Sequence, residues 1–136
     1  MSPHSAMSKP ARDLIGYCNA PPHANWPDGA RIAVNFCINY EEGAEMCVLN
    51  GDEHSEVRVS DVVVEARHGG RDLNIESSYE YGARVGYWRL LKAFTDRGLP
   101  GTVNLVGVAG EANPHALEAM IEAGFDLQLH GWRWSD

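Results

Sequence analysis

Two acidic side chains and one histidine are the residues of this sequence best suited to acid–base chemistry. Glu41 and Glu42 follow an apolar segment, residues 31–39, after one intervening residue, Tyr40, and His130 follows another, residues 125–129. If both segments are parallel strands, their carboxyl ends lie on the same edge of a sheet, where α/β proteins collect their chemistry. Two adjacent carboxylates also repel each other, which raises the pKa of one of them. The pattern predicts a general acid–base site; a solvated pair of loop carboxylates and a packed histidine are the alternative.

The strands that must position these residues are expected at 31–39, 101–108 and 125–129. The first is a nearly continuous apolar run, typical of a strand that is buried on both faces. Strands that alternate with helices pair in parallel through right-handed crossovers, so the fold class is α/β. Residues 43–78 carry frequent charges and glycines, and we expect a surface insertion there, with a short strand or helix within residues 55–64.

Two helices are expected between the strands. The first, over residues 80–97, ends where Gly98 favours a left-handed conformation and Pro100 forbids continuation. In the second, Asn113 is placed to cap the first turn and Pro114 suits the first helical position. The expected apolar faces are Tyr87, Leu90, Leu91 and Phe94 on the first helix and Leu117, Met120 and Ile121 on the second.

Composition and charge argue against several functions. The 136-residue chain holds 11 Lys and Arg against 19 Asp and Glu, with a formal charge of −8 and no basic run, so we expect no nucleic-acid or membrane partner. Residues 1–12 are interpreted as a disordered leader without the apolar run of a secretory signal. Three cysteines without a C-x-x-C pair favour buried free thiols. We therefore expect a cytoplasmic protein whose folded domain comprises residues 13–136.

The motifs at the two strand ends resemble those of the polysaccharide deacetylase (NodB-homology) family. Its members usually carry T-F-D-D, whose first Asp is the base, and H-[ST]-x-x-H; the second Asp and both His bind a divalent metal, usually zinc. This chain has residues 39–42, Asn-Tyr-Glu-Glu, and residues 130–134, His-Gly-Trp-Arg-Trp, in their place. Trp134 stands where the second metal-binding histidine would be, and an indole offers only a hydrogen-bond donor. Because a catalytic zinc needs three protein ligands, we expect no metal and no cofactor; zinc is the alternative.

One branch of that family, the metal-independent allantoinases (urate-catabolism proteins), is similar to residues 13–136. The shared motifs lie at residues 13–17, 21–27, 30–36, 39–43, 76–77 and 79–84 and at His130, Gly131 and Trp134. The resemblance implies a (β/α)7 barrel, of which this chain would be the N-terminal half: a partial deacetylase-type barrel with parallel strands and crossover helices. Its last strand would be an uncovered edge and its sheet would expose apolar surface, which implies self-association or a homo-oligomer.

The resemblance also implies a reaction: hydrolysis of a carbon–nitrogen bond in a small cyclic ureide, most simply the opening of allantoin to allantoate in purine catabolism. Glu41 would activate water, Glu42 would hydrogen-bond the ureide nitrogens or fix the charge of the site, and His130 would orient the substrate or act as an acid. The residues implied to bind substrate are Tyr40, Glu76, Glu80, Arg84 and Trp134.

Other readings stay open on the sequence alone. Trp134 could simply pack, and Glu80 and Arg84, four residues apart on a helix, could form a surface ion pair. The chain could be a metal-dependent carbohydrate or peptidoglycan N-deacetylase, or a non-catalytic remnant that pairs with an intact subunit. Since catalytic groups act as a unit, half a barrel is expected to be inactive or nearly so by itself.

Overall fold

The computed structural model describes residues 12–57, 65–66 and 68–134, and the chain divides into two compact units, Met1–Val34 and Asn35–Asp136. The described part of the first unit is irregular, with one short 3-10 helix at Pro27–Gly29. Asp13 forms a turn there, its carboxylate accepting from the backbone N–H of Ile15 at 2.9 Å. All but Arg12 of the predicted leader lies outside the described residues.

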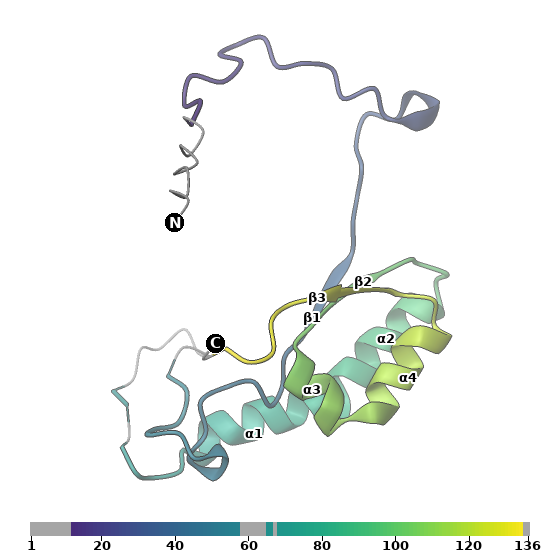
Figure 1. Ribbon diagram of the computed structural model, residues 1–136. Helices are drawn as coiled ribbons and strands as arrows, with labels where there is room; N and C mark the ends of the chain where they lie inside the picture. The colour runs from purple at the N-terminus through teal and green to yellow at the C-terminus, as the bar shows by residue number, and fades with distance from the viewer. Residues whose placement is uncertain (1–11, 58–64, 67, 135–136) are drawn as a thin grey trace, which may run out of the picture. The chain divides into compact units, whose positions relative to one another are not determined.

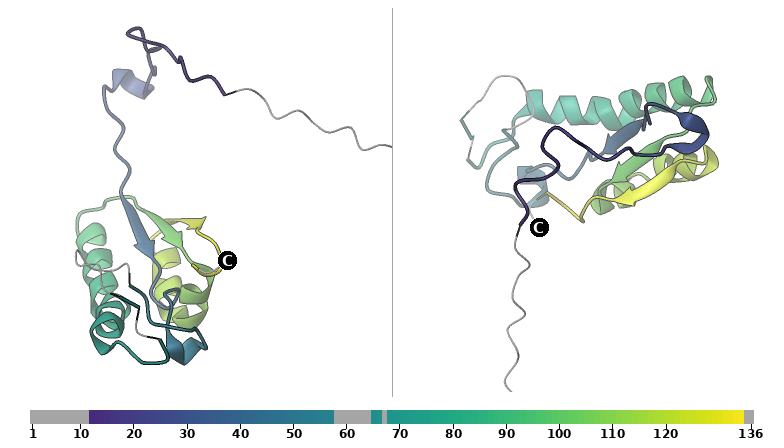
Figure 2. Two further views of the ribbon diagram at one scale, coloured as in Figure 1. Left: turned by 90° about the vertical axis from the view of Figure 1, so that its left-hand side faces the viewer. Right: turned by 90° about the horizontal axis from the view of Figure 1, so that it is seen from above.

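The second unit is a parallel three-stranded sheet with helices on one face, which confirms the α/β class (Figure 1). Its strands are β1 (Cys37–Tyr40), β2 (Thr102–Leu105) and β3 (Asp126–Leu129), in the order β1-β2-β3. The helices α2 (Tyr87–Thr95) and α4 (Pro114–Glu122) lie against the same side of the sheet (Figures 1 and 2). Side chains from both layers meet in one core, with Tyr40, Val103 and Met120 at its centre.

The first strand differs from the prediction in length and in burial. It begins at Cys37, although the carbonyl of Phe36 still accepts from the N–H of Thr102 at 2.9 Å. Residues 31–36 form no strand, and Ile32 and Val34 are exposed. Only alternate residues are buried, because helices cover one face: Tyr40 lies in the core whereas Asn39 is exposed. The expectation of a strand buried on both faces was therefore wrong.

The uncovered face of the sheet is polar. Asn104 of β2 donates a hydrogen bond from Nδ2 to Oδ1 of Asn39 at 2.8 Å, and Gln128 of β3 follows in the same register. Apolar surface is exposed instead along β3, which pairs only with β2 among the described strands and leaves Leu127 41% and Leu129 89% exposed. Among the described strands, β3 is thus an edge strand with exposed apolar side chains.

The predicted first helix is longer than expected. It consists of α1 (Leu73–Tyr81), a π-helical turn (Gly82–Gly86) and α2 in continuous succession. It begins at Leu73, seven residues before the predicted position 80, because the Asp72 carboxylate caps it by accepting from the N–H of Asn74 at 3.1 Å and of Ile75 at 3.3 Å. In the π turn the N–H of Tyr87 donates to the carbonyl of Gly82, five residues back.

The predicted capping residues are confirmed, whereas the predicted buried faces of the two helices are confirmed only in part. Gly98 adopts φ +58° after α2, and Asn113 caps α4 by accepting from the N–H of Ala116 at 3.3 Å, both as predicted. Two predicted core residues are not core: Leu90 is 47% and Ile121 is 61% exposed. The buried residues are instead Tyr87 on α2 and Ala116 and Met120 on α4.

The segment between β1 and α1 is irregular, as expected of an insertion. It contains a short 3-10 helix at Val48–Asn50 and an isolated bridge between His54 and His68, while most of the predicted element at 55–64 lies outside the described residues. Of the three thiols only that of Cys47 is buried; Cys18 and Cys37 are exposed, contrary to expectation. None of the helices in the described ranges is long and apolar enough to cross a membrane.

Asn113 joins two layers of the fold and provides a test of it. Besides capping α4, its Nδ2 donates to the hydroxyl of buried Tyr40 at 2.9 Å. Asn113→Ala should lower the free energy of unfolding by about 2 kcal/mol, about half from the cap and half from the bond to Tyr40. Asn113→Ser, which caps but is too short to reach Tyr40, should lose only about 1 kcal/mol. Urea titration measures both; equal losses would contradict the role of the Tyr40 bond.

Candidate active site

The parallel register brings Glu41 and His130 together. Tyr40, Leu105 and Leu129 are partners across the sheet, and the ladder continues for one more step, where the N–H of His130 donates to the carbonyl of Leu105 at 3.0 Å. One residue beyond each outer strand, His130 Nε2 lies 2.9 Å from Glu41 Oε1. The carboxylate is 22% and the imidazole 48% exposed, so the pair is open to solvent and to a ligand.

The loop that carries His130 is held by the start of a helix that the sequence did not reveal. In α3 (Gly107–Ala112) the N–H of Gly107 donates to the carbonyl of Gly131 at 3.0 Å, and that of Val108 to the carbonyl of Trp132 at 3.1 Å. These are N–H groups that the first turn of a helix leaves unpaired. A Cβ at position 107 would lie 2.4 Å from the Trp132 ring, so glycine permits this close approach.

A second attachment ties the same loop to the insertion. Arg133 donates from Nη1 to Oδ1 of Asp52 at 2.9 Å, contacts the other carboxylate oxygen through Nη2, and donates to the carbonyl of Glu45 at 3.0 Å. The guanidinium holds the pKa of Asp52 below its usual range. Because Asp52 lies in an irregular segment, sequence periodicity gave no signal for this pair.

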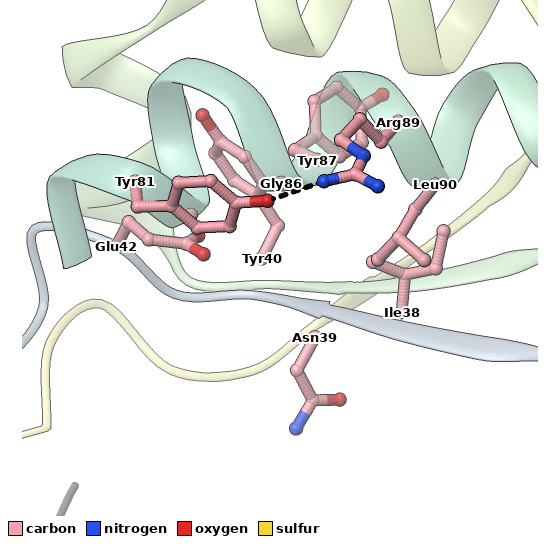
Figure 3. A pocket seen from close by; sticks show the side chains of 10 residues that line it. Ile38, Asn39, Tyr40, Glu42, Tyr81, Gly86, Tyr87, Arg89 and Leu90 are labelled. Carbon is pink, nitrogen blue, oxygen red and sulfur yellow. Dashed lines mark hydrogen bonds between the residues drawn. The ribbon is translucent and has the colours of Figure 1, made fainter. Parts of the chain in front are cut away.

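Glu42 turns away from the Glu41–His130 contact toward the helix. It lines a cavity of about 500 Å³ with Tyr40 and Tyr81, and Figure 3 shows the three side chains together. A Cβ at Gly82 would lie 2.2 Å from Glu42 Oε1, so glycine lets the carboxylate approach the π turn. Burial raises the pKa of Glu42, and the neighbouring Glu41 raises it further, although hydrogen bonds such as that from the Glu41 N–H at 3.1 Å oppose the shift.

A second cavity, of about 570 Å³, also borders Glu42 and includes two further predicted residues, Glu76 and Glu80. Glu76 is buried and accepts from Arg71 Nε at 3.1 and 3.0 Å, an ion pair that lowers the pKa of the Glu76 carboxyl. Glu80 accepts from Arg84 at 3.0 Å in an exposed pair, which is the surface arrangement considered as the alternative.

The two remaining predicted residues, Tyr40 and Trp134, both make aromatic contacts. The Tyr40 ring lies in the core, edge-on to Tyr87 at 4.9 Å between centroids. Trp134 is 41% exposed and meets Tyr79 edge-on at 6.0 Å. Of the predicted residues, the structure thus brings Glu41, Glu42 and His130 to one edge, with Glu76 and Glu80 around the adjoining cavity.

The described residues do not include a full set of ligands for the metal that the deacetylase motif would bind. Within the part of the chain that the structure describes, no group of three or more His, Cys, Asp or Glu side chains is arranged to hold an ion. The imidazole of His130 contacts Glu41, while Glu42 lies against the helix. A catalytic zinc needs three such ligands around an open position.

Comparisons with known proteins agree on one family. Residues 70–136 match the sequence model of the family described as polysaccharide deacetylase. A Schizosaccharomyces pombe protein named "Putative polysaccharide deacetylase" is 40% identical over 126 residues, which are 90% of this chain and 39% of that protein.

Two crystal structures have the same fold at the same TM-score of 0.84. A "probable Polysaccharide deacetylase" from Pseudomonas aeruginosa PAO1 is 51% identical, with 90% of this chain and 41% of that chain covered. Puue allantoinase is 45% identical, with 93% and 42% covered. The chain thus spans about two fifths of the length of the relatives it matches.

The Arg133–Asp52 pair generates a prediction about the loop that carries His130. Both side chains are largely buried, at 18% and 12% exposure, so Asp52→Ala should cost about 1–3 kcal/mol of unfolding free energy by leaving the guanidinium without this partner. Hydrogen exchange should accelerate at residues 131–134. Asp96→Ala, which breaks an exposed pair with Lys92, is the control and should cost less than about 1 kcal/mol. Equal effects of both variants would contradict the anchoring role.

The raised pKa of Glu42 predicts a pH-dependent stability. The folded protein holds this proton more tightly than the unfolded chain, so the stabilisation is lost as the pH rises from the ordinary value of 4.5 through the raised pKa. Glu42→Gln should remove that loss and gain stability relative to the wild type between pH 4.5 and neutrality. Urea unfolding at several pH values measures the difference; Glu122→Gln, at the exposed end of α4, is the control. A pH-independent difference would contradict the assignment.

Proposed function

The chain belongs to the polysaccharide deacetylase family, a family of hydrolases, and we propose that it carries part of the active site of an enzyme that hydrolyses a carbon–nitrogen bond in a small cyclic ureide such as allantoin. The observation that carries the proposal is the 2.9 Å contact between Glu41 Oε1 and His130 Nε2 at the carboxyl edge of the sheet. A carboxylate and an imidazole in contact can accept and deliver the protons that amide hydrolysis moves.

The proposed reaction needs one water molecule. Glu41 accepts a proton from this water as its oxygen bonds to the carbonyl carbon of the ring. The ring carbon–nitrogen bond then breaks, and His130 delivers a proton to the departing nitrogen. The products are a carboxylate, an open-chain urea and one proton, which the new carboxylic acid releases to solvent. The proton taken by Glu41 passes to His130 and restores the pair. Protein donors must stabilise the negative charge that develops on the carbonyl oxygen.

The choice of a ureide rests on two further observations. The solved allantoinase is 45% identical over nearly the whole of this chain. In addition, the described carboxylates and imidazoles do not form a metal-binding group, while Trp134 occupies the position of the missing histidine. A metal-dependent N-deacetylase is the second candidate, because two of the relatives carry the name polysaccharide deacetylase.

Hydrolysis of allantoin by the purified chain tests the proposal, with allantoate release followed before and after treatment with a chelator. The sequence leads us to expect slow turnover, so high protein concentrations are needed. Turnover should survive the chelator, and Glu41→Gln should reduce it by about 100- to 10,000-fold, as for loss of a general base.

Glu111→Gln, an exposed position at the end of α3, is the matched control and should keep the wild-type rate. A rate that disappears with the chelator and returns with zinc would favour the deacetylase reading instead. An unchanged rate in Glu41→Gln would overturn the proposal.

A further inference from the structure

The outer side of β3 directs backbone hydrogen-bonding groups away from the sheet. Within the described residues β3 pairs with β2 alone, so it forms one edge of the sheet (Figure 2). The N–H groups of Asp126 and His130 donate to backbone carbonyls at either end of β2, each at 3.0 Å. Successive residues of a paired strand direct these groups to opposite sides, so Leu127 and Leu129 direct theirs outward. Such an edge is a template for another strand.

The side chains along this edge differ between the two faces of the sheet. Leu127 and Leu129 are 41% and 89% exposed, on the face that carries the helices. Asp126, Gln128 and His130 lie on the opposite, polar face, and all three are exposed. In the described part of the chain the Asp126 carboxylate has no ion-pair partner. The edge therefore offers an apolar pair on one face and a free carboxylate near an imidazole on the other.

Residues 126–130, Asp-Leu-Gln-Leu-His, are complementary to a second copy of themselves that runs in the opposite direction. With Gln128 at the centre, Leu127 lies opposite Leu129 of the second copy, and Asp126 lies opposite its His130. The two leucines are the residues with outward backbone groups, so this register forms two hydrogen-bonded pairs. An acidic side chain directly opposite a basic one stabilises such a pair of strands, whereas like charges destabilise it.

Neighbouring registers satisfy fewer backbone groups. A shift by one residue would set outward-directed groups against inward-directed ones. A register centred on Leu127 would need Phe125, whose N–H already donates within the chain at 3.1 Å. A register centred on Leu129 would need Gly131, whose carbonyl already accepts within the chain at 3.0 Å. The register centred on Gln128 is thus favoured by hydrogen bonds, apolar contact and charge together.

We propose that two copies of this chain pair through β3 in antiparallel, about a twofold axis at Gln128, and so form one continuous sheet. Because that axis is normal to the sheet, the helices of both copies lie on the same face, where Leu127 of each copy packs against Leu129 of the other. On the polar face the second copy brings its Asp126 beside His130, and it thereby contributes a carboxylate to the site. The inference goes beyond the proposed function, because the association needs no hydrolysis.

Sedimentation velocity of the purified full chain over a range of concentrations, with a reductant present, tests the association. The mean mass should rise with concentration toward that of two chains, since a small interface gives a reversible dimer. Leu129→Lys should raise the dimer Kd at least about 100-fold, because the charge enters the symmetric apolar contact twice. Leu129 is exposed in the single chain, so the circular dichroism spectrum of the variant should equal that of the wild type.

Leu90→Lys is the matched control. Leu90 is also an exposed leucine, but it lies beside Ile38 of β1, at the other edge of the sheet (Figure 3). This variant should keep the wild-type Kd. Asp126→Lys, which sets a cation opposite His130, should raise the Kd about tenfold. A monomer at every concentration overturns the inference and leaves the edge to another polypeptide. A dimer that Leu129→Lys does not weaken overturns it as well.

A disulfide tests the register. Gln128 faces its own copy in a non-hydrogen-bonded pair, in which the Cα atoms are about 4.5 Å apart, within reach of a disulfide. In a chain that also carries Cys18→Ser and Cys37→Ser, Gln128→Cys should form a bond between the two residues at position 128 on mild oxidation, as mapped by mass spectrometry. Asn104→Cys, on the same face but in the central strand, should form none. A dimeric Gln128→Cys variant without this bond contradicts the proposed pairing.

Discussion

The parallel register of three short strands is the constraint on which the rest of the structure depends. Because Tyr40, Leu105 and Leu129 are partners, the residues that follow β1 and β3 leave the sheet at the same level. Successive side chains of a strand point to opposite faces of the sheet, so Glu41 lies on the same polar face as Asn39. A shift of the strand register by one residue would turn these polar side chains toward the helices and the core side chains toward solvent. The register is therefore costly to change.

The sheet fixes where Glu41 and His130 begin, and separate contacts fix where the His130 loop goes. Backbone N–H groups of α3 hold the loop from one side, and the Arg133–Asp52 pair holds it from the insertion. Both are directional hydrogen bonds to a short irregular segment, so the histidine is positioned by rigid neighbours although it lies on a loop. Because the Glu41–His130 pair is partly exposed, a ligand can reach it while the loop stays ordered.

Features that depend on neighbouring residues could be predicted from the sequence, whereas features that depend on distant contacts could not. The caps at Asn113 and Gly98 were predictable because each acts within one turn of chain, and the meeting of Glu41 with His130 followed from parallel topology. The helix α3 was missed because its glycine-rich sequence has poor intrinsic propensity and its first turn is held by distant carbonyls. The burial of Tyr79 likewise depends on an irregular segment whose path no periodicity encodes.

The π-helical turn at Gly82–Gly86 has a consequence for how the second cavity, which Tyr79 lines, can change over evolutionary time. Such a turn contains one residue more than a regular α-helical turn, and each residue of a helix corresponds to a rotation of about 100°. Loss of a single residue there would turn all of α1 about its axis relative to α2. Tyr79 would be carried away from Trp134 although every residue of the site kept its identity. Insertions and deletions in this helix, and not only substitutions, are thus a route by which descendants of one ancestral gene could acquire different ligands.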